Sequence, residues 1–374
     1  MDQGNRIRRG LRRGRWRAGR LQQRPRVLRI PAIDLSRGWR GTARGLPSAA
    51  FSFVMATGIL SSAFALIGWS APSFVLLIIA LVGLAVLVAL ATTRVMLFRS
   101  EIASDARDPA RAFGFFTTVA ALNVVGIRLY TPAQPWVTIA LAVISVPLWV
   151  LLAYGIPGAL ILGPREEPVA NRVDGSWFLW VVGTQSVAIV AAITGASTGN
   201  SLLADVAVAL WGIGVVLYLL LAALVSLRLL TTRSEPGSFS PSYWIFMGAT
   251  AISVLAGSQI LLLPATLPVV RATALLVSGI SYVLWAFGTA WVPLLVIFGV
   301  WRHLVKRVPF RYETSLWSVV FPLGMYSVAS LHFGAVANLP PLSAIGEGAV
   351  AVAALAWAVV TVVALRAVPH GAGR

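Results

Sequence analysis

Ten long apolar segments follow one another along the chain, and each can cross a membrane as a helix. About 20 apolar residues suffice to span the hydrocarbon core, and charge-free stretches such as 45–93 are longer than that. We predict spans at 47–68, 73–98, 112–130, 135–162, 176–195, 203–229, 241–262, 272–300, 314–335 and 344–366. The odd-numbered spans begin at intervals of about 65, 64, 65 and 73 residues, which indicates five repeated helical hairpins.

Small and polar residues alternate with aliphatic ones from span to span. The odd spans carry Ser, Thr, Asn, Gln and Gly, whereas the even spans are mostly aliphatic, with 272–300 a partial exception. Within the bilayer, burying a polar side chain costs little free energy only where the side chain contacts protein or water. The pattern predicts an all-α integral membrane protein: ten transmembrane helices as five hairpins in a quasi-five-fold arrangement, with the odd helices lining a central pore and the even ones facing lipid.

Helical spacing within the odd spans predicts what lines that pore. Phe246, Thr250, Ser253 and Gly257, for example, recur on one face at intervals of three or four residues. Neutral donors of this kind suit an anion that must both enter and leave. The same residue types also pack helices together in lipid, and that alternative stays open for each position. The predicted pore-lining residues are Thr57, Gly58, Phe116, Asn123, Gly126, Gly183, Gln185, Phe246, Thr250, Ser253 and Gly324.

A proline inside the ninth span predicts a local kink. Pro322 removes a backbone donor, and its ring clashes with the carbonyl of Ser318. Backbone groups freed in this way are tolerated at membrane depth only beside protein or a water-filled cavity. The kink therefore agrees with an inner position for this helix.

Composition fixes the class, and charge fixes the orientation. The chain is 58% hydrophobic and 11% charged, with a mean hydropathy of +0.84, which excludes a soluble enzyme. The net charge is +18, and residues 1–45 hold 14 arginines, from Arg6 to Arg44. Because positive flanks stay cytoplasmic, we predict a multi-pass protein of the cytoplasmic membrane with both termini inside.

The arginines divide the chain into three parts. We predict a disordered cytoplasmic tail at 1–45, a membrane domain at 46–366 and a short cytoplasmic tail at 367–374. The basic tail favours contact with anionic lipid headgroups. Nucleic-acid binding is a weaker alternative, because only Trp16 and Trp39 interleave with the arginines and nothing resembles a folded binding module.

The chain offers little for catalysis. It contains no cysteine, no HExxH motif and three histidines, and we expect neither a cofactor, a metal site nor enzymatic activity. Charged residues near the spans lie close to span ends, whereas ion-coupled pumps usually keep a carboxylate or histidine deep in the bundle. These residues are Arg94, Arg128, Asp205, Arg271 and Glu347. This placement favours a passive pathway.

Three motifs point to a known family. They are Phe53-Val-Met-Ala-Thr-Gly-Ile-Leu60, the Asp108–Ala120 segment, and Trp317-Ser-Val-Val-Phe-Pro-Leu-Gly-Met-Tyr326. The chain resembles the tellurite-resistance/C4-dicarboxylate transporter family, which includes the slow anion channels and the fungal malate and sulfite exporters. The resemblance implies a ten-helix pore, a homotrimer with one pore per subunit, and a gating phenylalanine at Phe321. Family pores often have prolines on several inner helices, whereas this chain has one mid-span, so Gly58, Gly126, Gly183 and Gly248 are candidate replacements.

The functional expectation is a passive channel or transporter for small inorganic anions or C4-dicarboxylates. Arg128 and Arg271, near the predicted outer mouth, either concentrate anions or anchor the helices at the interface. Three alternatives stay open. They are a proton- or sodium-coupled exporter of dicarboxylates or oxyanions, an enzyme acting on lipid-linked substrates, and a non-conducting sensor or scaffold that uses the basic tail.

Overall fold

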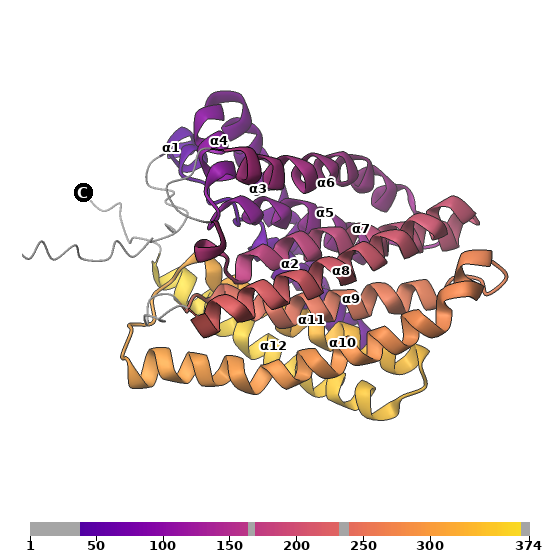
Figure 1. Cartoon of the computed structure of the whole chain (residues 1–374). Coiled ribbons are helices and arrows are strands. Elements are labelled where there is room, and N and C mark those ends of the chain that lie inside the picture. Colours follow the sequence, from indigo (N-terminus) through magenta and orange to yellow (C-terminus); the bar gives the residue numbers. More distant parts are fainter. Residues whose placement is uncertain (1–37, 164–168, 232–238, 368–374) are drawn as a thin grey trace, which may run out of the picture.

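Ten of the helices pair as five consecutive hairpins (Figure 1). The computed structural model describes residues 38–163, 169–231 and 239–367, and within these ranges every regular element is a helix. The hairpins are α2 (Ser52–Leu66) with α3 (Ser70–Leu97), α5 (Phe116–Leu129) with α6 (Trp136–Leu162), α7 (Leu179–Thr198) with α8 (Ser201–Thr231), α9 (Ile245–Leu261) with α10 (Pro268–Val300), and α11 (Trp317–Val336) with α12 (Pro340–Ala367). The predicted all-α class is confirmed.

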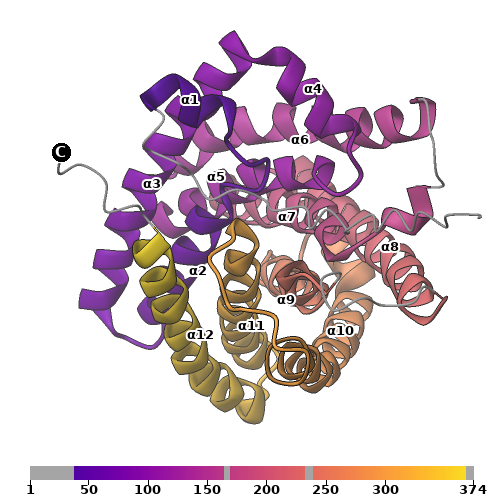
Figure 2. The ribbon, with the colours of Figure 1, turned by 90° about the vertical axis from the view of Figure 1, so that its left-hand side faces the viewer.

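The first helix of each hairpin joins an inner ring. In this ring α2 packs against α5, α5 against α7, α7 against α9, α9 against α11, and α11 again against α2. Seen end-on, these five helices lie around the centre, and α3, α6, α8, α10 and α12 lie outside them (Figure 2). All five inner helices run in the same direction, because each hairpin brings the chain back to the same end.

Burial follows the predicted alternation. In the most apolar stretch of each helix, 72–83% of residues are buried in α5, α7, α9 and α11, against 17–44% in α3, α6, α8, α10 and α12. The outer helices present apolar side chains such as Leu151, Val216 and Leu355 outward, where lipid would cover them. Small and hydroxyl residues in the inner helices allow the close packing that lipid favours between helices.

Nine helices of the described chain are long and apolar enough to cross a membrane, and α2 is shorter. At 15 residues, α2 is about 22 Å long at 1.5 Å per residue, less than the ~30 Å of hydrocarbon. The predicted span 47–68 was therefore too long at its start. Residues 48–51 form turns, in which the N–H of Ala50 bonds to the carbonyl of Pro47 and that of Ser52 to Ala49.

The other inner helices also begin with a short 3-10 turn. These turns are η2 (Ala112–Phe115), η4 (Gly175–Phe178), η5 (Pro241–Trp244) and η7 (Thr314–Leu316). At η4 and η5 the preceding residues, Asp174 and Ser240, accept a hydrogen bond from the N–H two residues on. Four of the five hairpins thus begin with a 3-10 turn, and the first begins with the turns at 48–51.

Tryptophans on the outer helices tie neighbouring hairpins together. The indole N–H donates from Trp149 to the hydroxyl of Thr184 at 3.0 Å, from Trp211 to the carbonyl of Ser253 at 3.0 Å, from Trp285 to the hydroxyl of Ser330 at 2.8 Å and from Trp357 to that of Thr57 at 3.1 Å. Each bond joins an outer helix to the inner helix of the next hairpin. Interhelical hydrogen bonds of this kind contribute about 0.6 kcal/mol each in a membrane.

Two short helices lie at the end where the inner helices begin. In α1 (Gly38–Arg44), Trp39 donates to the hydroxyl of Thr93 at 3.0 Å, and Arg44 forms an ion pair with Glu101 of α4 (Arg99–Arg107) at 2.8 Å. The prediction of a disordered tail over 1–45 is therefore wrong for 38–44. The rest of that tail (1–37) and residues 368–374 of the C-terminal tail lie outside the described residues. Two small elements complete the chain, η3 (Val169–Arg172) and the π-helical turn η6 (Trp301–Val305).

Candidate functional site

Two cavities lie at opposite ends of the inner ring. The amino-end cavity, of about 720 Å³, is lined by residues at the starts of the inner helices, such as Ser48, Gly114 and Leu179. The carboxyl-end cavity, of about 460 Å³, is lined by residues from their second halves, such as Ile193, Gln259 and His332. Residues from all five hairpins, or from the segments that lead into them, line each cavity. The two cavities therefore share the axis of the ring.

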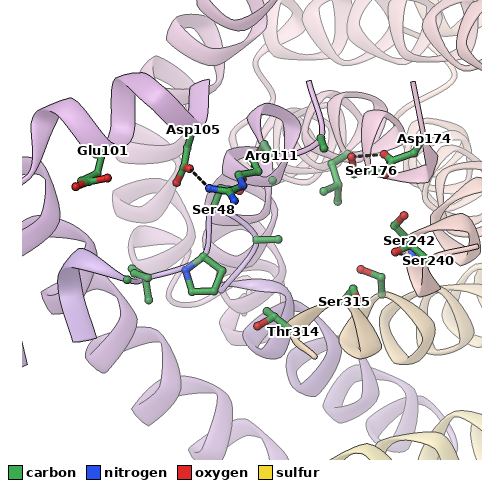
Figure 3. A pocket seen from close by; sticks show the side chains of 18 of the residues that line it. Ser48, Glu101, Asp105, Arg111, Asp174, Ser176, Ser240, Ser242, Thr314 and Ser315 are labelled. Carbon is green, nitrogen blue, oxygen red and sulfur yellow. Dashed lines mark hydrogen bonds and ion pairs between the residues drawn. The ribbon is translucent and has the colours of Figure 1, made fainter. Parts of the chain in front are cut away.

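Hydroxyl groups surround the amino-end cavity. Four entry turns contribute a serine to its wall, namely Ser48, Ser176, Ser242 and Ser315 (Figure 3). Because the inner helices are parallel, the partially positive ends of all five helix dipoles meet at this cavity. Serine hydroxyls and the first N–H groups of a helix are hydrogen-bond donors, so this end of the ring favours negative charge.

The arginines beside the amino-end cavity are paired with carboxylates. Asp105 accepts from Arg94 at 2.7 Å and from Arg111 at 3.0 Å, and the Asp105 and Arg94 side chains are nearly buried, 9% and 7% exposed. Asp108 forms ion pairs with Arg111 at 3.6 Å and with Arg172 at 2.8 Å. The formal charges largely cancel, so helix ends and hydroxyls carry most of the attraction for anions here.

The carboxyl-end cavity has one dominant charge. The guanidinium of Arg128 donates to the hydroxyl of Ser61 at 3.1 Å and to that of Ser73 at 2.7 Å, and no carboxylate of the described chain forms an ion pair with it. Gln259 and His332 lie 3.5 Å apart on the same wall. Arg128 is the penultimate residue of α5, and an arginine without a paired carboxylate on the cavity wall attracts anions.

Phe321 occupies the level between the two cavities on α11. Ser318 lines the amino-end cavity, and Met325 lines the carboxyl-end cavity. Phe321 lies three residues after Ser318 and four before Met325, so the helical period places it on the same side of the helix. Its side chain is 2% exposed.

The helix α11 continues through Pro322, and α9 approaches it closely there. A Cβ atom at Gly248 would lie 2.8 Å from Cγ of Pro322, which is too near for any side chain. Gly248 is thus required by the close approach of the two helices. Together, Gly248 and Pro322 fix the position of the turn that carries Phe321.

The eleven side chains predicted to line the pore lie elsewhere. Neither cavity is lined by any of them, and each is at a contact between helices. Asn123, for example, donates to Ser186 at 2.9 Å and accepts from Ser145 at 2.6 Å, which joins α5 to α7 and α6. Gln185 donates to the carbonyl of Trp211 on α8 at 3.1 Å. Neither side chain lines either of the two cavities, and which residues line an open pathway stays a prediction.

The other residues predicted to line the pore also lie at contacts between helices. The aromatic and glycine members fill close helix contacts, and the hydroxyl members bond along or between helices. Phe116 packs where a Cβ of Gly183 would lie, Gly58 faces Val124, Gly126 faces Leu141 and Gly324 faces Ile59. Phe246 packs against Phe178 and Trp291, Thr250 lies against Gly288, the carbonyl of Ser253 accepts from Trp211, and Thr57 accepts from Trp357.

The residues that do line the cavities were missed for a physical reason. Polar side chains in lipid bond to neighbouring helices as readily as they face water, so polarity alone does not identify the face toward the axis. The wall of the carboxyl-end cavity is largely aliphatic, with Ile59, Val124 and Ile252 among its residues. The recurrence of serine at the first or second residue of four of the five predicted odd spans was a usable signal in the sequence.

The amino-end cavity is lined by hydroxyl groups and paired charges, and the carboxyl-end cavity by aliphatic side chains and Arg128. Among the described residues no three His, Asp or Glu side chains gather as a metal site would require. The architecture and the cavities together define a multi-pass membrane protein built on a ring of five helical hairpins. Residues 45–365 match the family described as voltage-dependent anion channel (SLAC1), and the chain belongs to this family of anion channels and transporters. The resemblance noted from the three motifs is confirmed.

Individual relatives agree with this assignment. An uncharacterized membrane protein of Mycobacterium tuberculosis strain H37Rv is 46% identical over 158 residues, which are 42% of this chain and 80% of that protein. A counterpart in strain CDC 1551 matches equally. An uncharacterized transporter of Methanocaldococcus jannaschii is 29% identical over 122 residues, a third (33%) of this chain and 34% of that protein.

Proposed function

We propose that the protein conducts small anions passively along the axis of the inner ring, with Phe321 as the gate. The observation that carries the proposal is the position of this buried ring between two cavities that both favour negative charge. An apolar constriction excludes water from an ion, so conduction requires the ring to move. Inorganic anions and C4-dicarboxylates are the proposed substrates.

The proposal includes orientation and assembly. The arginine-rich segment before α2 places the amino-end cavity on the cytoplasmic side by the positive-inside rule. Arg302, Lys306 and Arg307, after α10, support the same side. The plasma membrane is the proposed location, with both termini cytoplasmic. A homotrimer with one pore per subunit follows from the family resemblance.

Anion flux into liposomes tests the gate. We expect Phe321→Ala to raise the flux of chloride, nitrate or malate several-fold, because removal of the ring leaves an opening between the cavities. Phe333→Ala is the matched control, since Phe333 is equally buried on α11 but lies beyond the level between the cavities. Equal flux in wild type and in well-folded Phe321→Ala would refute the gate.

One observation favours proton coupling as a second candidate. His332 lines the carboxyl-end cavity, and an imidazole can bind and release protons near physiological pH. A proton-coupled exporter would accumulate its anion against a gradient when a proton gradient is imposed, and His332→Gln would abolish the accumulation. Flux that only follows the anion's own gradient would eliminate coupling.

A further inference from the structure

Arg128 is held on the wall of the carboxyl-end cavity by one edge of its guanidinium. Its Nε donates to the hydroxyl of Ser61 at 3.1 Å, and its Nη2 donates to the hydroxyl of Ser73 at 2.7 Å. Nη1 makes no hydrogen bond within the described chain, and the fold does not shut it off from solvent. One edge of this cavity-lining guanidinium is therefore bound, and the other edge is open.

The two serines are bound to each other as well as to Arg128. Ser61 near the end of α2 and Ser73 near the start of α3 are buried. The hydroxyl of Ser61 donates to the carbonyl of Ser73, and the hydroxyl of Ser73 donates to the carbonyl of Ser61, both at 2.7 Å. Because a hydroxyl has a single proton, both oxygens are left with lone pairs for Arg128. The serine pair thus fixes the plane of the guanidinium.

The second hairpin is closed by a similar contact without an arginine. Thr138 of α6 donates to the carbonyl of Gly126 on α5 at 2.7 Å, and these two residues are 12 positions apart, as Ser61 and Ser73 are. One hydroxyl therefore suffices to join the two helices of a hairpin near their connection. The second hydroxyl of the first hairpin, and the arginine bound to the pair, are not needed for closure and indicate a further role.

The open edge of Arg128 has no acid to neutralise it. Among the described residues, no aspartate or glutamate lines the carboxyl-end cavity or forms an ion pair with Arg128. Aliphatic side chains such as Ile127, Ile189 and Leu255 form much of the wall. An apolar surrounding lowers the local dielectric constant and strengthens electrostatic contacts. The charge of Arg128 is thus available to an anion that enters from solution.

We propose that the carboxyl-end cavity binds one anion in direct contact with the Nη1–Nη2 edge of Arg128, and that Ser61 and Ser73 are positioning residues for this contact. Two parallel N–H groups on one edge of a planar guanidinium match an oxyanion such as nitrate. Because the other edge is already fixed, less conformational entropy is lost when the anion binds. The inference rests on the proposed function and adds the contact that holds the anion.

Direct contact and long-range attraction place different demands on Arg128. Long-range attraction requires only the charge and weakens with salt, whereas contact also requires the orientation of the guanidinium. Neither Ser61 nor Ser73 lines the cavity, so loss of their hydroxyls can affect the anion only through Arg128. Variants of the two serines therefore keep the charge and release the orientation.

Isothermal titration of the purified full-length protein with nitrate measures the contact without flux, and Arg128→Gln defines the binding that occurs elsewhere. We expect Ser61→Ala combined with Ser73→Ala to weaken the Arg128-dependent binding about tenfold, or about 1.4 kcal/mol, at unchanged charge. Arg128→Lys should weaken it similarly, because an ammonium lacks the fork. Ser73→Thr keeps the hydroxyl and should bind as wild type does. Ser62→Ala is the matched control, because Ser62 lines the cavity but donates to the carbonyl of Gly58 at 3.2 Å.

The serine double variant gives the decisive comparison. Unchanged nitrate affinity in this variant, or an equal loss in Ser62→Ala, overturns the positioning role, and wild-type affinity in Arg128→Lys overturns the direct contact. If the double variant does not fold, Ser73→Ala and Arg128→Lys make the same comparison one residue at a time. Absent flux with serine-dependent binding would refute conduction and leave the site standing. Flux through Phe321→Ala without Arg128-dependent binding would refute the site alone.

Discussion

The two cavities are built from the same five helices but acquire their affinity for anions in different ways. At the amino end, Arg94 and Arg111 are neutralised by Asp105, so parallel helix starts and serine hydroxyls supply the positive potential. At the carboxyl end the helix dipoles have the opposite sign, and Arg128 supplies a full charge against them. In a ring of parallel helices, a charged side chain is therefore needed to attract anions only at the carboxyl end, because the helix dipoles already attract them at the amino end.

Breaking the charge balance at the amino end should have the largest effect on stability. Asp105→Ala leaves Arg94 buried and unpaired, which we expect to lower the free energy of unfolding by about 3–5 kcal/mol. Glu101→Ala breaks the exposed pair with Arg44 and should cost about 1 kcal/mol or less. Detergent-denaturation curves measure both, and equal losses would contradict the neutralisation described for this end.

Removing the single charge at the carboxyl end should slow anion entry from that side. We expect Arg128→Gln to reduce flux about tenfold at low ionic strength, and less at high ionic strength, because salt screens steering. Arg271→Gln is the control, since Arg271 is exposed on α10 and does not line the cavity. Equal changes in flux for the two variants would show that Arg128 only anchors its helix at the membrane interface.

The pH dependence of Asp174 tests the helix start that carries a carboxylate. Burial raises the pKa of Asp174 above its usual 3.8, the Ser176 hydrogen bonds and Arg228 lower it, and Asp108 raises it further. The folded state thus holds the proton more tightly, and stability is lost as the pH rises from 3.8 through the folded pKa. Asp174→Asn should be more stable than wild type at neutral pH, and thermal unfolding near pH 4 should show a smaller difference.

The smallest effect is expected at a seam between hairpins. Thr57→Val removes the acceptor for Trp357, which should cost about 0.6–1.7 kcal/mol of stability and leave anion selectivity unchanged. Denaturation curves and flux in one preparation measure both quantities. Altered selectivity would return Thr57 to the pore wall and contradict its assignment to helix packing.

The hairpin repeat could be predicted from the sequence, whereas the faces of the helices could not. Period and hydropathy predicted five hairpins and their alternating burial, because lipid imposes both on any spanning helix. The identity of the residues facing the axis depends on how neighbouring helices rotate, and Asn123 and Gln185 form interhelical bonds in place of facing the axis. The short α2 and the helix at 38–44 depend on tertiary contacts that leave no periodic signal.

The depth of the two cavities has an electrical consequence. In the proposed pathway, solvent would enter both cavities, and the membrane voltage would fall mainly across the turn of α11 around Phe321. A monovalent anion crossing that turn would exchange close to 2.3 kcal/mol with each 100 mV of potential. Movement of the proposed Phe321 gate would thus control passage through the region where most of the voltage falls.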